Sequence, residues 1–305
     1  MTKMILIVGF LGSGKTTMMQ EILKKYKDRK VGVIVNEFGE VNIDAKIIDH
    51  DGIKIAELSN GSIFCACIKD KFVDSLIEMS GRDLDYLFIE ASGLADPANI
   101  SQILEGIRAK VADPYDYRGS ICIVDGENFL DLYEVLPAIK SQIEFSMAVI
   151  INKGDLVEES TLGEVTEKIS AINPKASSYV TSYCNVDTKE IVDNLAISET
   201  QARDTVNTAE TRPTTFVLRG KDTVPMDNLK KFIEDISGST YRVKGFVKTD
   251  KGDMEVSSVG KNIQITPWEK GIEQTALTAI SSVGFKLMSV ITKAIDENVK
   301  GYIQI

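Results

Sequence analysis

Residues 9–16 read GFLGSGKT, which matches every fixed position of the phosphate-binding pattern GxxxxGK(S/T). A short apolar run at 5–8 precedes this stretch, and apolar residues at helical spacing follow it as far as Tyr26. A glycine-rich loop between a strand and a helix surrounds phosphate groups with backbone N–H donors, and the helix N-terminus adds partial positive charge. The stretch therefore predicts a nucleotide-binding P-loop rather than an ordinary glycine-rich turn.

The polar residues of this loop match the needs of a bound nucleoside triphosphate. The Lys15 ammonium can neutralise the β- and γ-phosphates, which also makes it a candidate catalytic residue, and the Thr16 hydroxyl can ligate Mg²⁺. The expected phosphate contacts are Gly12, Ser13, Gly14, Lys15, Thr16 and Thr17.

The charge and composition of the chain argue against several kinds of binding partner and of site. The chain has 305 residues and a net charge of −10, which argues against broad binding to nucleic acid or to an anionic membrane. No apolar stretch is long enough to span a bilayer. The four cysteines form no disulfide-type framework, and a single histidine excludes a histidine-rich metal tail. We expect a cytoplasmic protein.

Short apolar runs alternate with helical patterns over the first two-thirds of the chain. This alternation predicts an α/β fold of the P-loop NTPase type, a mainly parallel sheet flanked by helices. The expected strands lie at 5–8, 31–35, 53–58, 86–89, 121–124, 147–151 and 179–181, and the expected helices near 18–26, 72–77 and 188–195.

The pattern changes near residue 197, where a polar stretch without an apolar stripe begins. We expect a P-loop domain over 1–197, a linker over 198–213 and a smaller α+β domain over 214–305. The expected elements of the small domain are strands at 215–218, 241–248, 254–259 and 276–281, the middle two as a hairpin, and helices at 226–236 and 285–295.

Residues 152–155 read NKGD and follow the apolar run at 147–151. The Asp155 carboxylate can accept hydrogen bonds from the N1–H and the exocyclic amine of guanine, a donor pair that adenine lacks. The Lys153 stem can pack along the base, and Asn152 can brace the loop. A surface turn is the alternative for so short a motif, but its place after a strand and behind a P-loop favours guanine recognition.

Acidic residues follow two other expected strands. Glu90 begins EASG at 90–93, where a carboxylate can hold the Mg²⁺ shell or orient the attacking water, and the Gly93 N–H can sense a γ-phosphate. Glu37 lies in NEFGE at 36–40 and can serve the same chemistry. Solvated loop acids are the alternative. The carboxyl edge of an open α/β sheet is where ligands bind, which favours the functional interpretation.

Taken together, these motifs resemble the CobW/YjiA-like GTPases, relatives of UreG and HypB. The resemblance rests on GFLGSGKTT at 9–17, NEFGE at 36–40, EASGLADP at 90–97, NKGD at 152–155, TSYCNVD at 181–187 and YRVKGFV at 241–247. It spans nearly the whole chain and implies a Mg²⁺-dependent GTPase that binds GTP and GDP and is slow without a partner. It also implies that Ser182 lies in the loop behind the guanine base. A homodimer is compatible with the resemblance.

The metal motif of that family, GCxCC, is altered in this chain. The corresponding residues 61–65 read GSIFC, so that only Cys65 matches, and Cys67 follows two residues later. Two thiols on one side of an extended segment, with Glu37 as a further ligand, would suit an exchangeable Zn²⁺ or Co²⁺ ion. The alternative is that both are ordinary thiols in a member that has lost metal binding.

The resemblance implies GTP-driven delivery of a metal or metal cofactor, with a link to cobalamin as one form, to a client protein. The first alternative is a nucleotide-dependent activator of a corrinoid or metalloprotein client that carries no metal itself. Two further alternatives are a GTP-binding scaffold with negligible turnover and a kinase that acts on a small metabolite. The NKGD motif argues against the kinase.

Overall fold

The computed structural model describes residues 1–36, 54–58, 69–134, 136–195, 213–260, 262–269 and 271–305. These residues form two compact units, one ending at Leu195 and the other beginning at Pro213. The expected linker at 198–213 lies, except for Pro213, outside the described residues. In the part of the chain that the structure describes, we find no helix with the length and apolar character needed to cross a bilayer.

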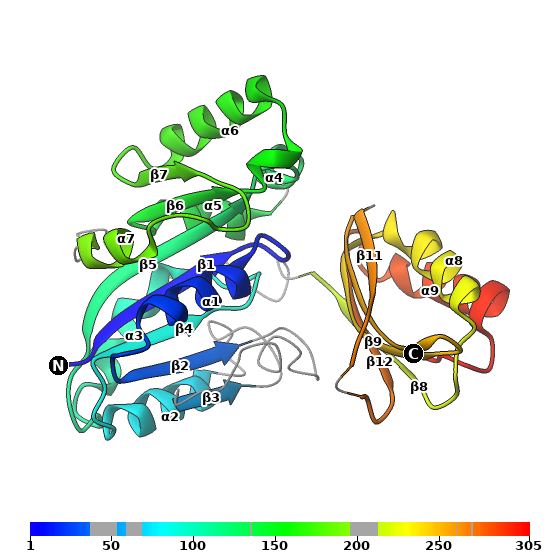
Figure 1. Cartoon of the computed structure of the whole chain (residues 1–305), viewed down its shortest axis with the longest axis horizontal. Coiled ribbons are helices and arrows are strands. Elements are labelled where there is room, and N and C mark those ends of the chain that lie inside the picture. The colour runs from blue at the N-terminus through cyan, green and yellow to red at the C-terminus, as the bar shows by residue number, and fades with distance from the viewer. Residues whose placement is uncertain (37–53, 59–68, 135, 196–212, 261, 270) are drawn as a thin grey trace. The chain divides into compact units, whose positions relative to one another are not determined.

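The first unit is built on a seven-stranded sheet in the order β3-β2-β4-β1-β5-β6-β7 (Figure 1). Each pairing between these described strands is parallel, which confirms the predicted sheet. The strands are β1 (Lys3–Gly9), β2 (Val31–Asn36), β3 (Lys54–Leu58), β4 (Tyr86–Glu90), β5 (Asp116–Asp125), β6 (Ala148–Asn152) and β7 (Ser177–Val180). The P-loop follows β1. Because β1 lies between β4 and β5, the loops after β4 and β5 lie beside the P-loop.

Helices α1 and α7 cover one face of this sheet. Met18 and Ile22 of α1 pack with Ile191 of α7 over inward-facing strand residues such as Phe88. The α-helices in the described part of the unit are α1 (Lys15–Lys25), α2 (Lys69–Ser80), α3 (Ile100–Ile107), α4 (Phe129–Leu132), α5 (Pro137–Glu144), α6 (Glu159–Ile172) and α7 (Thr188–Asn194). Helices α3 to α6 are not among the expected elements. For α5 the reason is physical, because it buries Ser141 and Gln142, which blurs its apolar stripe.

The second unit is a five-stranded antiparallel sheet in the order β11-β10-β9-β12-β8, with two α-helices and a π-helix at Ile295–Val299 among its described residues. Its elements are β8 (Thr215–Gly220), α8 (Met226–Ser237), β9 (Thr240–Thr249), β10 (Gly252–Val259), β11 (Asn262–Pro267), β12 (Thr275–Ser281) and α9 (Lys286–Ala294). The predicted hairpin is present as β9 and β10. Strand β11 is additional, and it lacks a buried apolar run because Ile263 and Ile265 are only partly buried.

Candidate functional site

The P-loop turns between β1 and α1 through backbone angles that favour glycine. Gly12 has φ 74° and Gly14 has φ 112°, both in the left-handed region where a side chain is strained. Gly14 is also the N-cap of α1. A Cβ atom at Gly14 would come within 2.4 Å of the Asn152 amide nitrogen. The glycines predicted from the motif therefore allow both the turn and its close approach to the end of β6.

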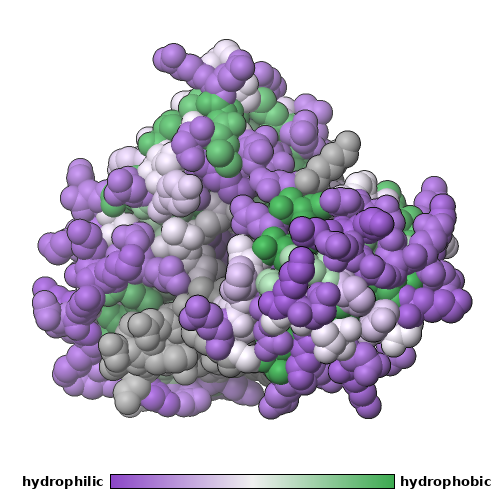
Figure 2. All heavy atoms as spheres, turned by 45° about the vertical axis from the view of Figure 1, so that its right-hand side comes forward, coloured by the Kyte–Doolittle hydropathy of each residue, from purple (hydrophilic) through white to green (hydrophobic). Residues whose placement is uncertain are grey.

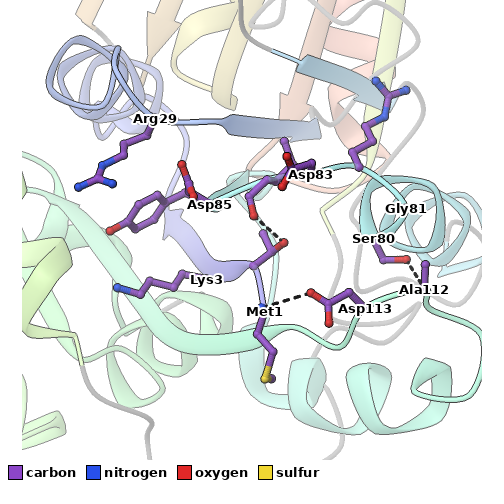
Figure 3. A pocket seen from close by; sticks show the side chains of 13 residues that line it. Met1, Lys3, Arg29, Ser80, Gly81, Asp83, Asp85, Ala112 and Asp113 are labelled. Atoms are coloured by element: carbon purple, nitrogen blue, oxygen red, sulfur yellow. Dashed lines mark hydrogen bonds and ion pairs between the residues drawn. The ribbon is translucent and has the colours of Figure 1, made fainter.

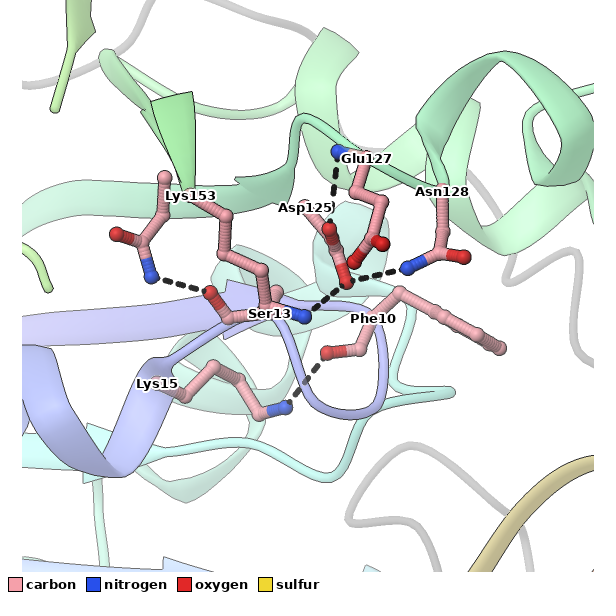
Figure 4. Close-up of polar contacts among 8 residues, drawn as sticks. Phe10, Ser13, Lys15, Asp125, Glu127, Asn128 and Lys153 are labelled. Atoms are coloured by element: carbon pink, nitrogen blue, oxygen red, sulfur yellow. Dashed lines mark hydrogen bonds and ion pairs between the residues drawn. The ribbon is translucent and has the colours of Figure 1, made fainter. Parts of the chain in front are cut away.

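Lys15, the first residue of α1, reaches back over the loop. Its Nζ atom donates to the Phe10 carbonyl oxygen at 3.1 Å, and the side chain is only 7% exposed (Figure 4). The ammonium is thus held along the loop that would surround a phosphate. A positive charge, a helix N-terminus and glycine backbone fit the groups of a polyphosphate.

Thr16 and Glu90, each predicted from the sequence to take part in a magnesium site, contact each other beside the loop. The Thr16 hydroxyl donates to Glu90 Oε1 at 2.8 Å, and Glu90 is 2% exposed. The parallel register places Glu90 opposite Ile7 of β1, two residues before Gly9. A hydroxyl and a carboxylate are hard oxygen donors of the kind that Mg²⁺ prefers, so the pair fits that ion. Thr17 follows in the first turn of α1.

Asn152 connects the P-loop to the loop at 181–187. Its amide nitrogen donates to the Ser13 carbonyl at 2.8 Å, and its side-chain oxygen accepts from the backbone N–H of Cys184 at 3.0 Å. Cys184 has φ 54° and its thiol contacts the Gly14 carbonyl at 3.5 Å. Burial raises the pKa of Cys184 to about 12, so the thiol is uncharged near neutral pH and packs as an apolar group.

Asp155 and Ser182 lie next to each other. The Asp155 backbone N–H donates to the Ser182 hydroxyl at 3.1 Å, and the Gly154 N–H donates to the Thr181 carbonyl at 2.9 Å. These two bonds hold the NKGD turn against the 181–187 loop, while the Asp155 side chain is exposed. The carboxylate is therefore accessible to a base that would stack on this surface.

Lys153 forms an ion pair with a residue outside the predicted site. Its Nζ atom lies 2.6 Å from Asp125 Oδ2, and Asp125 is 4% exposed (Figure 4). The same carboxylate accepts from the Glu127 N–H and the Asn128 amide. This ion pair holds the Lys153 stem at the end of β5. Asp125 is the last residue of β5, as Glu90 is of β4, so the sequence signal that points to Glu90, an acidic residue directly after an apolar run, also points to Asp125.

Gly93 packs directly against the P-loop. A Cβ atom there would come within 2.7 Å of the Leu11 backbone nitrogen and 2.4 Å of Leu11 Cδ2. The loop after β4 therefore lies against the P-loop, and the contact of the Gly93 N–H with a γ-phosphate stays a prediction. Glu37, Cys65 and Cys67 lie outside the described residues. Among the residues the structure does describe, no group of three His, Cys, Asp or Glu side chains is arranged to hold a metal.

A hollow of about 670 Å³ lies elsewhere on the first unit (Figure 3). Lys3 and Tyr86, where β1 and β4 begin, are in its lining, together with Arg29, Asp83 and Asp113. The P-loop follows the opposite end of β1, and no predicted site residue lines this hollow. It is therefore a separate feature from the phosphate site.

Comparisons with known proteins identify a matching family and several relatives. A family model described as "CobW/HypB/UreG, nucleotide-binding domain" matches residues 3–180. The zinc-regulated GTPase metalloprotein activator 1 of Dictyostelium discoideum is 28% identical over 78% of this chain and 61% of that protein. The zinc chaperone YjiA of Escherichia coli is 30% identical over 60% of this chain and 58% of that protein. The matches thus span about three-fifths of these relatives' lengths.

Among solved structures, the Zn(II)-bound YjiA GTPase from E. coli aligns with 98% of this chain and 99% of that chain, at 20% identity and a TM-score of 0.49.

Proposed function

The chain belongs to the CobW/HypB/UreG family, and from this premise we propose that it binds GTP with Mg²⁺ and hydrolyses it to drive delivery of a metal or metal cofactor to a client protein. The nucleotide part of the proposal rests on the hydrogen bonds of the Asn152 side chain. This side chain joins the Ser13 carbonyl of the P-loop to the loop that supports Asp155. The phosphate site and the guanine-recognition segment therefore form one continuous structure.

The chain's own residues supply the expected chemistry. Lys15 sets a positive charge against the β- and γ-phosphates, where negative charge shifts during phosphoryl transfer. Mg²⁺, when bound through Thr16 and Glu90, would neutralise further phosphate charge. The nearly buried Glu90 carboxylate is also close enough to the P-loop to orient an attacking water, and the Gly93 N–H would contact the γ-phosphate. Glu37 remains a proposed additional carboxylate.

Metal delivery is supported by the relatives, two of which are named as a zinc chaperone and a zinc-regulated metalloprotein activator. In this chain Cys65 and Cys67 are the proposed ligands, with Zn²⁺ or Co²⁺ as the ion. The second candidate function is activation of a metalloprotein or corrinoid client without a carried metal. It is favoured by the replacement of two family cysteines by Ser62 and Phe64. A homodimer and a cytoplasmic location remain predictions.

The nucleotide part is tested by phosphate release from the purified protein. We expect slow turnover of GTP that requires Mg²⁺ and stops with EDTA, because Lys15 alone leaves much of the phosphate charge unneutralised. ATP should not be hydrolysed at a comparable rate. A metabolite phosphorylation assay serves as the control for the kinase alternative. Equal hydrolysis of ATP and GTP, or turnover that EDTA does not affect, would contradict the proposal.

The metal part is tested by titrating Zn²⁺ or Co²⁺ into wild type and the Cys65→Ser/Cys67→Ser protein, each with a GTP analogue and with GDP. If the thiols serve a nucleotide-controlled carrier, wild-type metal affinity should differ between the two nucleotide states. By linkage, the metal should then change nucleotide affinity by the same factor. Affinity should also weaken as pH falls, because the binding form is the thiolate. Equal, weak binding by both proteins would reject the carrier role and leave the client activator.

A further inference from the structure

Helix α5 contacts the loop after β4 through two consecutive buried polar residues. The Gln142 amide nitrogen donates to the Ala95 carbonyl at 2.8 Å and to the Gly93 carbonyl at 3.3 Å. The Ser141 hydroxyl donates to Asp96 Oδ1 at 2.5 Å. Gln142 and Ser141 are fully buried, where polar groups are costly unless they make such bonds. Side chains of α5 therefore hold the loop in place, although each bonded pair is separated by 45 or more positions in the sequence.

The C-terminal end of α5 is itself fixed to the rest of the unit. The Asn173 amide donates to the carbonyls of Ile143 and Glu144 at 2.9 and 3.2 Å, at the end where a helix leaves carbonyls unpaired. The Ser146 hydroxyl donates to the Gln142 carbonyl at 2.6 Å, and the Ser120 hydroxyl of β5 donates to the Phe145 carbonyl at 2.6 Å. The Gln142 side chain therefore projects from a helix with little freedom to move.

The loop that Gln142 holds is a tight turn. The Ala95 N–H donates to the Ser92 carbonyl at 2.9 Å, which closes a turn around Gly93. On its other side, Gly93 packs against Leu11 of the P-loop. A glycine peptide rotates more freely than any other. Two bonds from one rigid amide to the carbonyls on either side of Leu94 prevent that rotation and keep the turn against the P-loop.

We propose that Gln142 is a positioning residue for γ-phosphate recognition, which holds the 92–95 turn so that the Gly93 N–H faces the terminal phosphate. This inference rests on the proposed function. GTP and GDP differ only in the γ-phosphate, so loss of Gln142 should weaken GTP-analogue binding and turnover and leave GDP binding in place. A residue that only stabilises the fold would affect both nucleotides alike.

The test compares wild type with Gln142→Met, which keeps the side-chain length and removes the donor. We expect kcat and the ratio of GTP-analogue to GDP affinity to fall by about tenfold, as expected when buried carbonyls lose their partner. GDP affinity should stay within about twofold of wild type. The matched control is Gln102→Met, a substitution of an exposed glutamine on α3 that should change neither quantity. Melting curves with GDP verify folding.

Gln142→Asn provides a second variant in case Gln142→Met does not fold, because it keeps an amide on a stem too short to reach both carbonyls. It should shift the affinity ratio in the same direction. An unchanged ratio and kcat in folded variants, or equal losses for GDP and the GTP analogue, would overturn the role of Gln142. A wild-type protein that neither binds nor hydrolyses GTP would instead reject the proposed function.

Discussion

Lys15→Ala is expected to abolish tight GTP binding and hydrolysis while the protein stays folded. Lys15 Nζ lies along the P-loop at 3.1 Å from the Phe10 carbonyl, where it would face the β- and γ-phosphates. Removing one preorganised group that stabilises transition-state charge typically costs a factor of about 100 to 1,000 in rate. The loss should be at least that large here, because the same ammonium also supports ground-state binding.

The fold should tolerate this change, because alanine has a high intrinsic helix propensity and adds no bulk. Lys25→Ala is the matched control, since Lys25 is an exposed lysine in the last turn of the same helix. Phosphate release and titration with a fluorescent GTP analogue measure the effect, and circular dichroism verifies the fold. Wild-type turnover in a folded Lys15→Ala protein would show that the P-loop is not the site of hydrolysis.

Asp155→Asn is expected to remove most of the preference for GTP over ATP. The carboxylate would accept from both guanine donors, whereas an amide would present one of its own donors to the base. The affinity ratio should fall by roughly a hundredfold or more, as in other sites where one polar group recognises a substrate. Triphosphates of xanthine, which carries a carbonyl in place of the guanine amine, should gain affinity because the new amide can donate to it.

The side chain of Asp155 is exposed, so the substitution should not disturb the fold, and its backbone bond to Ser182 is retained. Asp74→Asn, at an exposed position of α2, is the matched control. Competition of GTP, ATP and xanthosine triphosphate against a fluorescent nucleotide gives the ratios. Equal binding of ATP and GTP by the wild-type protein would remove guanine recognition by Asp155 altogether.

The predicted elements of the first unit come from local signals. Parallel strands buried on both faces appear as continuous apolar runs, so that β1, β4, β5 and β6 could be located to within a few residues. β5 is the exception at one end, since it begins at Asp116, before its apolar run. Helices α5 and α6 were not predicted, because their apolar periodicity is weak. Helix α5 buries polar residues, and helix α6 has few buried positions.

The sequence by itself determined the P-loop, the strand ends that carry Glu90 and NKGD, and the chemistry those residue types imply. Each of these depends on neighbours within a few positions, whose spacing the backbone geometry dictates. Only the tertiary structure decided that Asn152 holds Ser13, 139 positions earlier, that Lys153 pairs with Asp125, and that Gln142 holds Gly93. Such bonds form when distant segments pack together, so they leave no periodic pattern along the chain.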